Sequence, residues 1–349
     1  MPPNSKRLVY FENWMDPAAV QILRAEPDIE LVRLAFADPV EDNQQAMRLA
    51  HGYQILPRTE LRQPFFGDAQ LIERCPRLLA ISATGAGYDM IDTDACTAAG
   101  ILVVNQSGTN SEAVAQHALA MMLALTKQLV QSDRAMRRTS QLDRNLYTGR
   151  ELTRRTVGIV GLGHIGRRVA ELCRSLFAMR VIAYDPYLSP AECRAPGAEP
   201  VALDELLRQA DFVTLHCPRT AETMGMIGGR EFALMKPTAY FITTARGGIT
   251  DEAALCDALG AARIAGAGVD VFLEEPPPAD HPLTRFENVV LSPHIAGMTD
   301  EARYNMAVGA AEQWIMILRG ERPPRLCNPE VWPRYGARYE RIMGVKVKG

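Results

Sequence analysis

Three short segments carry side chains suited to acid–base and anion-binding chemistry, and each follows a predicted strand. The first places Arg246 before two glycines, so a guanidinium lies beside exposed backbone. This arrangement is suited to bidentate hydrogen bonding of a carboxylate. The second, residues 270–276, places carboxylates after its strand, and the third places His294 after its strand. If these strands share one parallel sheet, the three segments meet at one edge. There the Arg would clamp and polarise a substrate, the His would exchange a proton, and a Glu would fix the imidazole tautomer.

A glycine turn earlier in the chain predicts a dinucleotide site on the same sheet. An apolar run ends at the sequence Gly161-Leu162-Gly163-His164-Ile165-Gly166, and a helical pattern follows. In this G-x-G-x-x-G arrangement the first glycine permits a tight turn. The second lets the backbone approach a pyrophosphate, and the third allows close packing of helix on strand.

The acid expected after the next strand is Asp185, about 20 residues beyond the glycines. A carboxylate there can bind the ribose 2′-hydroxyl of NAD. The three residues that follow, 186–188, offer no Arg or Lys for a 2′-phosphate. The sequence therefore favours NAD over NADP.

The elements that must position these residues form two series of alternating strands and helices, which predict two parallel α/β sheets. The first series has expected strands at 7–11, 29–35, 54–56, 78–82 and 101–104. The second has about six, at 157–160, 181–184, 212–216, 239–243, 267–271 and 289–292. Long helices are expected over 111–137 and 299–319, and the Pro-rich, basic tail from Glu321 is expected to be irregular.

The composition indicates which partners and which cellular compartment to expect. The chain has 349 residues and a formal net charge of −3, which gives no reason to expect nucleic acid or a membrane surface as partner. Its N-terminus does not resemble a signal peptide, and the apolar run 113–125 is too short to span a bilayer. The seven cysteines form no C-x-x-C pair, which favours reduced thiols in a cytoplasm and no metal site.

From about residue 56 to about residue 320 the sequence resembles the D-isomer-specific 2-hydroxyacid dehydrogenases, the family of phosphoglycerate, glycerate and D-lactate dehydrogenases. The segments that carry the resemblance are 84–92, 110–117, the glycine turn with Asp185, the His-x-Pro loop 216–218 with Thr223, and the surroundings of Arg246, Glu275 and His294. The resemblance implies a doubly wound architecture in both lobes. A Rossmann NAD-binding domain (106–298) would be inserted in a flavodoxin-like substrate domain (1–105 and 299–349).

The resemblance also implies a reaction. Nicotinamide would exchange a hydride with C2 of a 2-keto acid, and His294, paired with Glu275, would exchange the proton. Glu275 is preferred to Glu274 because the family's acid directly precedes a proline. The substrate carboxylate would bind Arg246 and the amides of the loop Gly85-Ala86-Gly87. Further cofactor contacts would come from Cys217, Pro218, Thr223, Thr244, Ala245, Asp270, Gly297 and the residues of the glycine turn.

Two alternatives stay open in the sequence. Arg58 could bind a distal anion such as phosphate, or could be a solvated loop residue. The same fold includes an NADH-sensing corepressor that keeps these motifs, whereas formate dehydrogenase replaces the acid with glutamine, so Glu275 argues against it. The resemblance further implies a homodimer built largely on the nucleotide domain.

Overall fold

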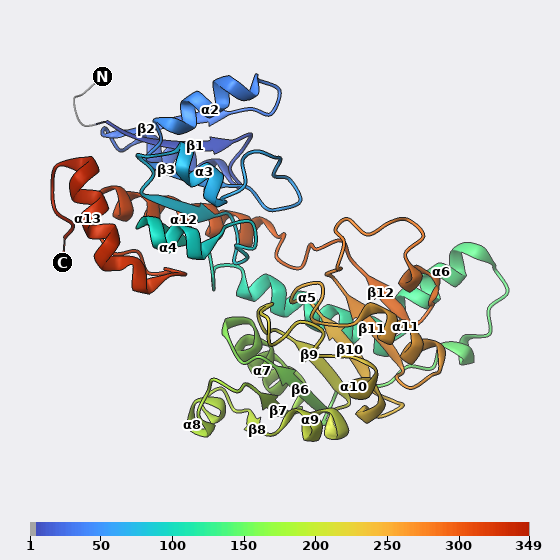
Figure 1. Ribbon diagram of the computed structural model, residues 1–349. Helices are drawn as coiled ribbons and strands as arrows, with labels where there is room; N and C mark the ends of the chain where they lie inside the picture. The colour runs from blue at the N-terminus through green and yellow to red at the C-terminus, as the bar shows by residue number, and fades with distance from the viewer. Residues whose placement is uncertain (1–4, 349) are drawn as a thin grey trace. The chain divides into compact units, whose positions relative to one another are not determined.

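The computed structural model describes residues 5–348, which form two compact units (Figure 1). Unit 1 contains the chain up to Asn110 and again from Thr299, and unit 2 contains Ser111–Met298. Each unit is built on its own parallel sheet. The predicted architecture of two parallel α/β sheets is confirmed.

Unit 1 has a five-stranded sheet in the order β2-β1-β3-β4-β5, the doubly wound order of flavodoxin-like folds. The strands are β1 (Lys6–Phe11), β2 (Ile29–Leu34), β3 (Gly52–Ile55), β4 (Ala80–Ala83) and β5 (Leu102–Val104). Side chains alternate between the two faces: Val9 and Phe11 belong to one apolar core, and Leu8 to the other. The first core is covered by α2 (Val40–Arg48), α3 (Ala69–Arg74) and α4 (Thr93–Ala99).

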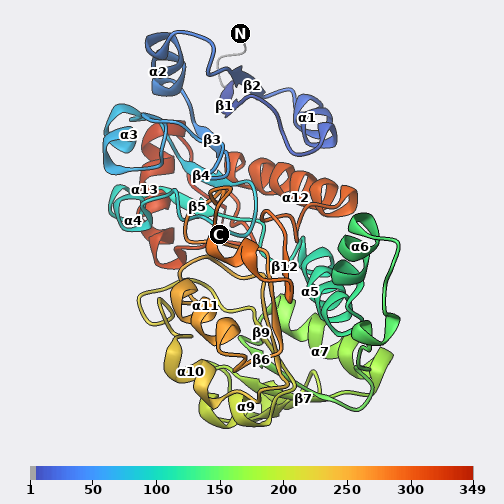
Figure 2. The ribbon, with the colours of Figure 1, turned by 90° about the vertical axis from the view of Figure 1, so that its right-hand side faces the viewer.

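The other face of this sheet is covered by α1 (Pro17–Arg24) and by two helices from the end of the chain, α12 (Asp300–Leu318) and α13 (Trp332–Met343). In Figure 2, α1 and α12 lie near each other within unit 1. Trp314 of α12 is fully buried and packs so closely that a Cβ on Gly52 would lie 2.5 Å from its ring. Only glycine therefore fits at the start of β3.

The prediction of an irregular tail was wrong for α13. Its proline and arginine content is typical of a loop, but Tyr335 and Tyr339 stand one turn apart and both are buried. Their hydroxyls donate to the carbonyls of Ile317 and Leu318 at 2.9 and 3.0 Å, where α12 ends. The buried tyrosine pair supplies the apolar stripe that holds the helix on the sheet.

Unit 2 has a seven-stranded sheet in the order β12-β11-β10-β9-β6-β7-β8, the Rossmann order with one strand added at the far edge. The strands are β6 (Thr156–Val160), β7 (Arg180–Tyr184), β8 (Glu199–Pro200), β9 (Phe212–Leu215), β10 (Tyr240–Thr243), β11 (Gly266–Val269) and β12 (Val289–Leu291). Seven strands replace the expected six because β8 has two residues, too few for an apolar pattern. The strand order reverses between β6 and β9, where a doubly wound sheet opens a crevice for ligands.

Helices cover both faces of this sheet. On one face α5 (Ser111–Thr126) and α7 (His164–Phe177) pack against Val157 and Ile159, and on the other α9 (Leu203–Gln209), α10 (Gly229–Leu234) and α11 (Glu252–Gly260) pack against Val160. Shorter elements complete the two units: α8 (Pro190–Arg194), η1 (Arg144–Tyr147), η2 (Pro282–Arg285) and η3 (Pro329–Val331).

The single helix predicted over 111–137 is two helices, α5 and α6 (Leu129–Arg138), bent by 57°. The bend comes at Gln128, which adopts a left-handed conformation with φ of 50° and cannot continue a right-handed helix. Within residues 5–348 no single helix is long and apolar enough to cross a membrane; α5 and α6 reach that length and composition only together, across their bend.

Candidate active site

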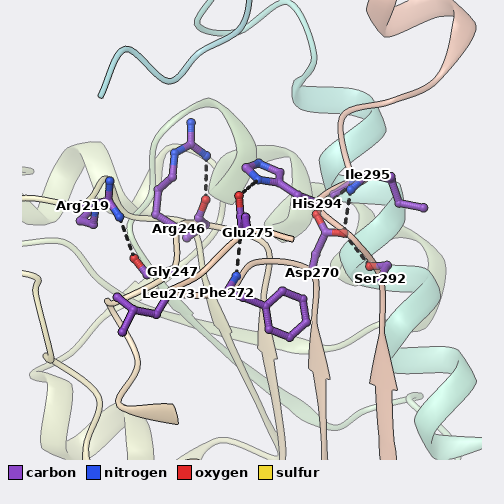
Figure 3. A network of polar contacts seen from close by, with 12 residues as sticks. Arg219, Arg246, Gly247, Asp270, Phe272, Leu273, Glu275, Ser292, His294 and Ile295 are labelled. Atoms are coloured by element: carbon purple, nitrogen blue, oxygen red, sulfur yellow. Dashed lines mark hydrogen bonds and ion pairs between the residues drawn. The ribbon is translucent and has the colours of Figure 1, made fainter. Parts of the chain in front are cut away.

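Arg246, Glu275 and His294 come from three neighbouring strands of unit 2. They follow β10, β11 and β12 respectively, which are adjacent in the sheet. Figure 3 shows the three side chains on the same side of the strand ends, with Glu275 between the other two. The structure therefore brings together the three residues that the sequence suggested could act together.

Glu275 and His294 form the central pair. His294 Nδ1 lies 2.7 Å from Glu275 Oε2, and the Phe272 amide donates to Glu275 Oε1 at 3.0 Å. A carboxylate accepts hydrogen bonds, so Nδ1 carries the proton and Nε2 is left to exchange one. The side chains are 41% and 20% exposed for His294 and Glu275. The imidazole thus has its tautomer fixed on one side and is accessible on the other.

The Glu275 carboxyl is held in its charged form. Burial by itself would raise its pKa, but the hydrogen bonds from His294 and the Phe272 amide, with the charge of Arg246, bring the pKa below its ordinary value of 4.5. Glu275 therefore stays ionised at neutral pH and stabilises a positive charge on the imidazole beside it.

Asp270 builds the turn that carries His294. Its side chain is fully buried, and it accepts from Ser292 Oγ at 2.5 Å and from the amides of Ile295 and Ala296 at 2.9 and 3.0 Å. The Asp270 carbonyl also accepts from the His294 amide at 2.7 Å. His294 itself has a φ of 55°, a conformation that non-glycine residues rarely adopt and that surrounding bonds must hold. The predicted contact of Asp270 with nicotinamide stays a prediction.

The sequence analysis missed two residues that hold this turn in place. Ser292 Oγ donates to Asp270 and accepts from His117 Nε2 of α5 at 2.9 Å. His117 thus anchors the turn to a helix far away in sequence. Ser292 could have been found because it stands two residues before His294, but no local pattern links His117 to it.

Arg246 is positioned by the glycine that follows it. A Cβ on Gly247 would lie 1.7 Å from the Phe272 carbonyl oxygen, so only glycine lets the loop after β10 pack on the loop that carries Glu275. The Arg246 guanidinium donates to the Ala245 carbonyl at 2.7 Å, and Arg219 donates to the Gly247 carbonyl at 3.2 Å (Figure 3). These contacts place a half-buried cation on the same side as the imidazole.

The glycine turn fits a dinucleotide phosphate. Gly161 has a φ of 89°, and a Cβ there would lie 2.6 Å from the Cys217 amide nitrogen; a Cβ on Gly166 would lie 2.2 Å from the Gly161 carbonyl oxygen. Both glycines are required by packing alone. At Gly163, which precedes the first turn of α7, no atom of the described residues outside the adjoining chain lies within 4 Å of such a Cβ, so this side is open to a ligand.

Other predicted cofactor residues lie around the same sheet edge. Asp185 directly follows β7 and accepts from the Leu162 and Tyr187 amides at 2.9 and 3.1 Å, which ties it to the glycine turn. The Thr244 hydroxyl is buried without a hydrogen-bond partner within residues 5–348, which leaves it free to bond a ligand. The remaining positions predicted to contact the cofactor also belong to unit 2: His164 and Ile165 in the first turn of α7, Cys217, Pro218 and Thr223 after β9, Ala245 after β10, and Gly297 after β12. The residues present therefore fit a nicotinamide dinucleotide.

The predicted substrate residues lie in unit 1. The loop 85–87 follows β4, and it is fixed by Asn105, whose amide donates to the Ala86 carbonyl at 2.7 Å, and by the Gln106 amide, which donates to the Gly85 carbonyl at 2.9 Å. Arg58 is exposed on the segment after β3. Their roles stay predictions.

Comparison with known proteins identifies relatives. Residues 119–296 match the model for D-isomer specific 2-hydroxyacid dehydrogenase, NAD binding domain. The D-3-phosphoglycerate dehydrogenase of Archaeoglobus fulgidus is 42% identical over 72% of this chain and 48% of its own length, so this chain spans about half of that relative. The glyoxylate reductase of Thermofilum pendens is 44% identical over 76% of this chain and 79% of its own. The structure of D-lactate dehydrogenase from Aquifex aeolicus, complexed with NAD and lactic acid, superimposes with a TM-score of 0.76 at 28% identity, covering 92% and 98% of the two chains.

Proposed function

Because this chain belongs to the D-isomer specific 2-hydroxyacid dehydrogenase family, we propose that it is an NAD-dependent oxidoreductase acting on a small D-2-hydroxy acid or 2-keto acid. The observation that carries the proposal is the 2.7 Å contact between His294 Nδ1 and Glu275, beside Arg246. A tautomer-fixed imidazole next to a cation is suited to proton exchange at a carbonyl whose neighbouring carboxylate is bound.

Each residue has one role in this reaction. The glycine turn and Asp185 would hold a nicotinamide dinucleotide, which when bound would supply or accept the hydride at C2 of the substrate. His294 gives a proton from Nε2 to the keto oxygen, and in the reverse direction takes it from the hydroxyl. Glu275 stabilises the protonated imidazole, and Arg246 binds the carboxylate. The amides of the loop 85–87 are assigned to the same carboxylate by resemblance.

The cofactor assignment rests on Asp185 and the open side of Gly163. A carboxylate at the end of β7 binds a ribose 2′-hydroxyl and repels a 2′-phosphate. We expect kcat/KM with NADH to exceed that with NADPH. A clear preference for NADPH would refute the role given to Asp185.

We also propose that the protein is a cytoplasmic homodimer with no nucleic-acid or membrane partner. Helix α6, which lies entirely in the described part of the chain, supports the dimer because none of its residues is buried. Its apolar side chains Leu129 and Met136 are 58% and 71% exposed, and exposed apolar side chains are typical of an interface. The seven free cysteines support a reducing compartment. Sedimentation of the wild type and of Met136→Glu tests the dimer: a wild-type monomer would refute it, and a variant that still dimerises would exclude this face of α6.

The test of the activity is NADH oxidation with 2-keto acids of graded size and charge. We expect turnover of at least one, and a loss of about 10²–10⁴-fold in kcat for His294→Ala with NADH affinity retained. Unchanged turnover in this variant would remove His294 from its role. Saturable NADH binding without turnover across the panel would refute the enzymatic function and point to a sensor.

A further inference from the structure

A second carboxylate–histidine pair lies beside the loop that carries Glu275. Glu252, in the first turn of α11, has one oxygen 3.1 Å from His281 Nε2, and its other oxygen accepts from the Leu273 amide at 2.6 Å. The His281 side chain is 10% exposed and that of Glu252 23%, so little water competes for these contacts. Glu252 therefore joins the two ends of the segment 273–281, and Glu275 stands between those ends.

The two ring nitrogens of His281 have different partners, which fix its tautomer. A carboxylate only accepts hydrogen bonds, so the Nε2 that faces Glu252 carries the proton. Nδ1 is then an acceptor, and the Leu283 amide donates to it at 3.3 Å. The ring also lies edge-on to the Phe272 ring, with 5.3 Å between the centroids. His281 is thus held on three sides, with its Nε2 proton directed at Glu252.

The peptide that joins Phe272 to Leu273 connects this pair to the candidate active site. Its N–H is the group that donates to Glu252, and its carbonyl oxygen is the atom that a Cβ on Gly247 would meet at 1.7 Å. A planar peptide held at both its N–H and its C=O is not free to rotate. Phe272 is thereby oriented, and its own amide donates to Glu275 Oε1 at 3.0 Å (Figure 3). Glu252 therefore controls the direction of a donor that the Glu275 carboxylate needs.

We propose that Glu252 and His281 are positioning residues of the reaction. Together they hold the peptide after Phe272, so that the Phe272 amide stays directed at one oxygen of Glu275. The other oxygen of Glu275 is then kept in line with His294 Nδ1. This inference rests on the proposed function, and it adds two residues that act on the same site through Glu275.

Two substitutions at His281 separate its contact with Glu252 from its other contacts. His281→Gln places an N–H near the position of Nε2 and keeps a donor for Glu252, whereas His281→Asn keeps only the acceptor for Leu283. We expect kcat to fall about tenfold in His281→Asn and to be at least about fivefold higher in His281→Gln, with equal NADH affinity in both.

A matched pair of glutamates separates positioning from stability. Glu252→Ala removes both acceptors and should lower kcat by about tenfold or more. Glu231 is the control, because it lies in the first turn of the neighbouring helix α10 and also accepts from a backbone amide, that of Gly228, at 3.0 Å. Glu231→Ala should lower the melting temperature and leave kcat unchanged.

A double-mutant cycle tests whether the pair acts through Glu275. Adding Glu252→Ala to Glu275→Gln should lower kcat by less than a further twofold or so, because the carboxylate that the Phe272 amide orients is already absent. Losses that multiply in the double variant would overturn the inference, as would equal kcat values in the two His281 variants.

Hydrogen exchange at the Phe272 amide measures the same geometry without turnover. Glu252→Ala should accelerate this exchange by about tenfold, and Glu231→Ala should leave it unchanged. A protein that turns over no keto acid but shows this acceleration would refute the proposed function and support the positioning of the Phe272 amide by Glu252. An unchanged exchange rate in Glu252→Ala would overturn the positioning role, whatever the turnover.

Discussion

Replacing Glu275 by glutamine tests the central pair with the least change of shape. In the wild type one carboxylate oxygen accepts from His294 Nδ1 and the other from the Phe272 amide. A glutamine has one oxygen for these two donors. If its oxygen faces the Phe272 amide, its NH₂ faces the imidazole and reverses the tautomer; if it faces His294, the Phe272 amide loses its acceptor. In both cases the charge that stabilises the protonated imidazole is gone.

The size of the effect follows from the geometry. A hydrogen bond to a charged group contributes about 1.5–3 kcal/mol. Because the His294 side chain is 41% exposed, solvent screens the pair and the lower part of that range, about 1.5–2 kcal/mol, applies. This corresponds to a loss of about 10–30-fold in kcat/KM.

The assay is steady-state reduction of a 2-keto acid, with NADH affinity measured separately by fluorescence. Glu274→Gln is the matched control, since Glu274 is the neighbouring carboxylate and is exposed. We expect NADH affinity to be unchanged in both variants and kcat/KM to fall only in Glu275→Gln. Two variants with equal kcat/KM would refute the assignment. A double-mutant cycle with His294→Gln should show strong coupling, because both substitutions remove one interaction.

Three further predictions concern the same unit. The pKa of Glu275 is lower in the folded protein than its ordinary 4.5, so the stabilising effect of its carboxylate is complete above about pH 4.5 and is lost as pH falls through the folded value. Urea unfolding of the wild type and of Glu275→Gln should therefore give free energies of unfolding that converge in acid and differ by a constant amount at neutral pH. Gly166→Ala should lower the free energy of unfolding by about 1–3 kcal/mol, whereas Gly163→Ala should change it by less than about 0.5 kcal/mol yet weaken NADH binding about tenfold. Equal melting temperatures for the two variants would contradict the packing argument. Asp270→Asn should accelerate hydrogen exchange at the Ile295 amide and lower kcat about tenfold or more, because it removes a charged hydrogen-bond acceptor from the turn. An unchanged exchange rate at the Ile295 amide would show that the turn is stable without the Asp270 carboxylate.

The sequence predicted most of the fold because strand patterns in parallel sheets are local. Apolar runs of four to six residues separated by helical periods predict β–α repetition without long-range information. The failures lie where long-range contacts decide. Helix α13 is held by two buried tyrosine hydroxyls that donate to carbonyls at the end of α12. The break at Gln128 is a single left-handed residue within a helical pattern.

The sequence could name the candidate site residues but not their contacts. The strand ends after β10, β11 and β12 pointed to Arg246, Glu275 and His294, whereas the choice between Glu274 and Glu275 needed resemblance to a family. The anchoring of the turn by His117 joins α5 to residues far along the chain. Trp14 and Gln54 line one cavity of unit 1 although they stand 40 residues apart in the chain. No periodicity records such contacts, because each depends on how the elements pack in three dimensions.

The return of α12 to unit 1 constrains the order in which a nascent chain can fold. Unit 2 is continuous, so all of its strands can pair as soon as they leave the ribosome. One face of the unit 1 sheet, which α1 covers only in part, stays partly exposed until Trp314 has been synthesised and packs on Gly52. A translation product that stops before α12 would carry a finished second unit and a first sheet with part of one apolar face exposed, a species prone to self-association and to degradation.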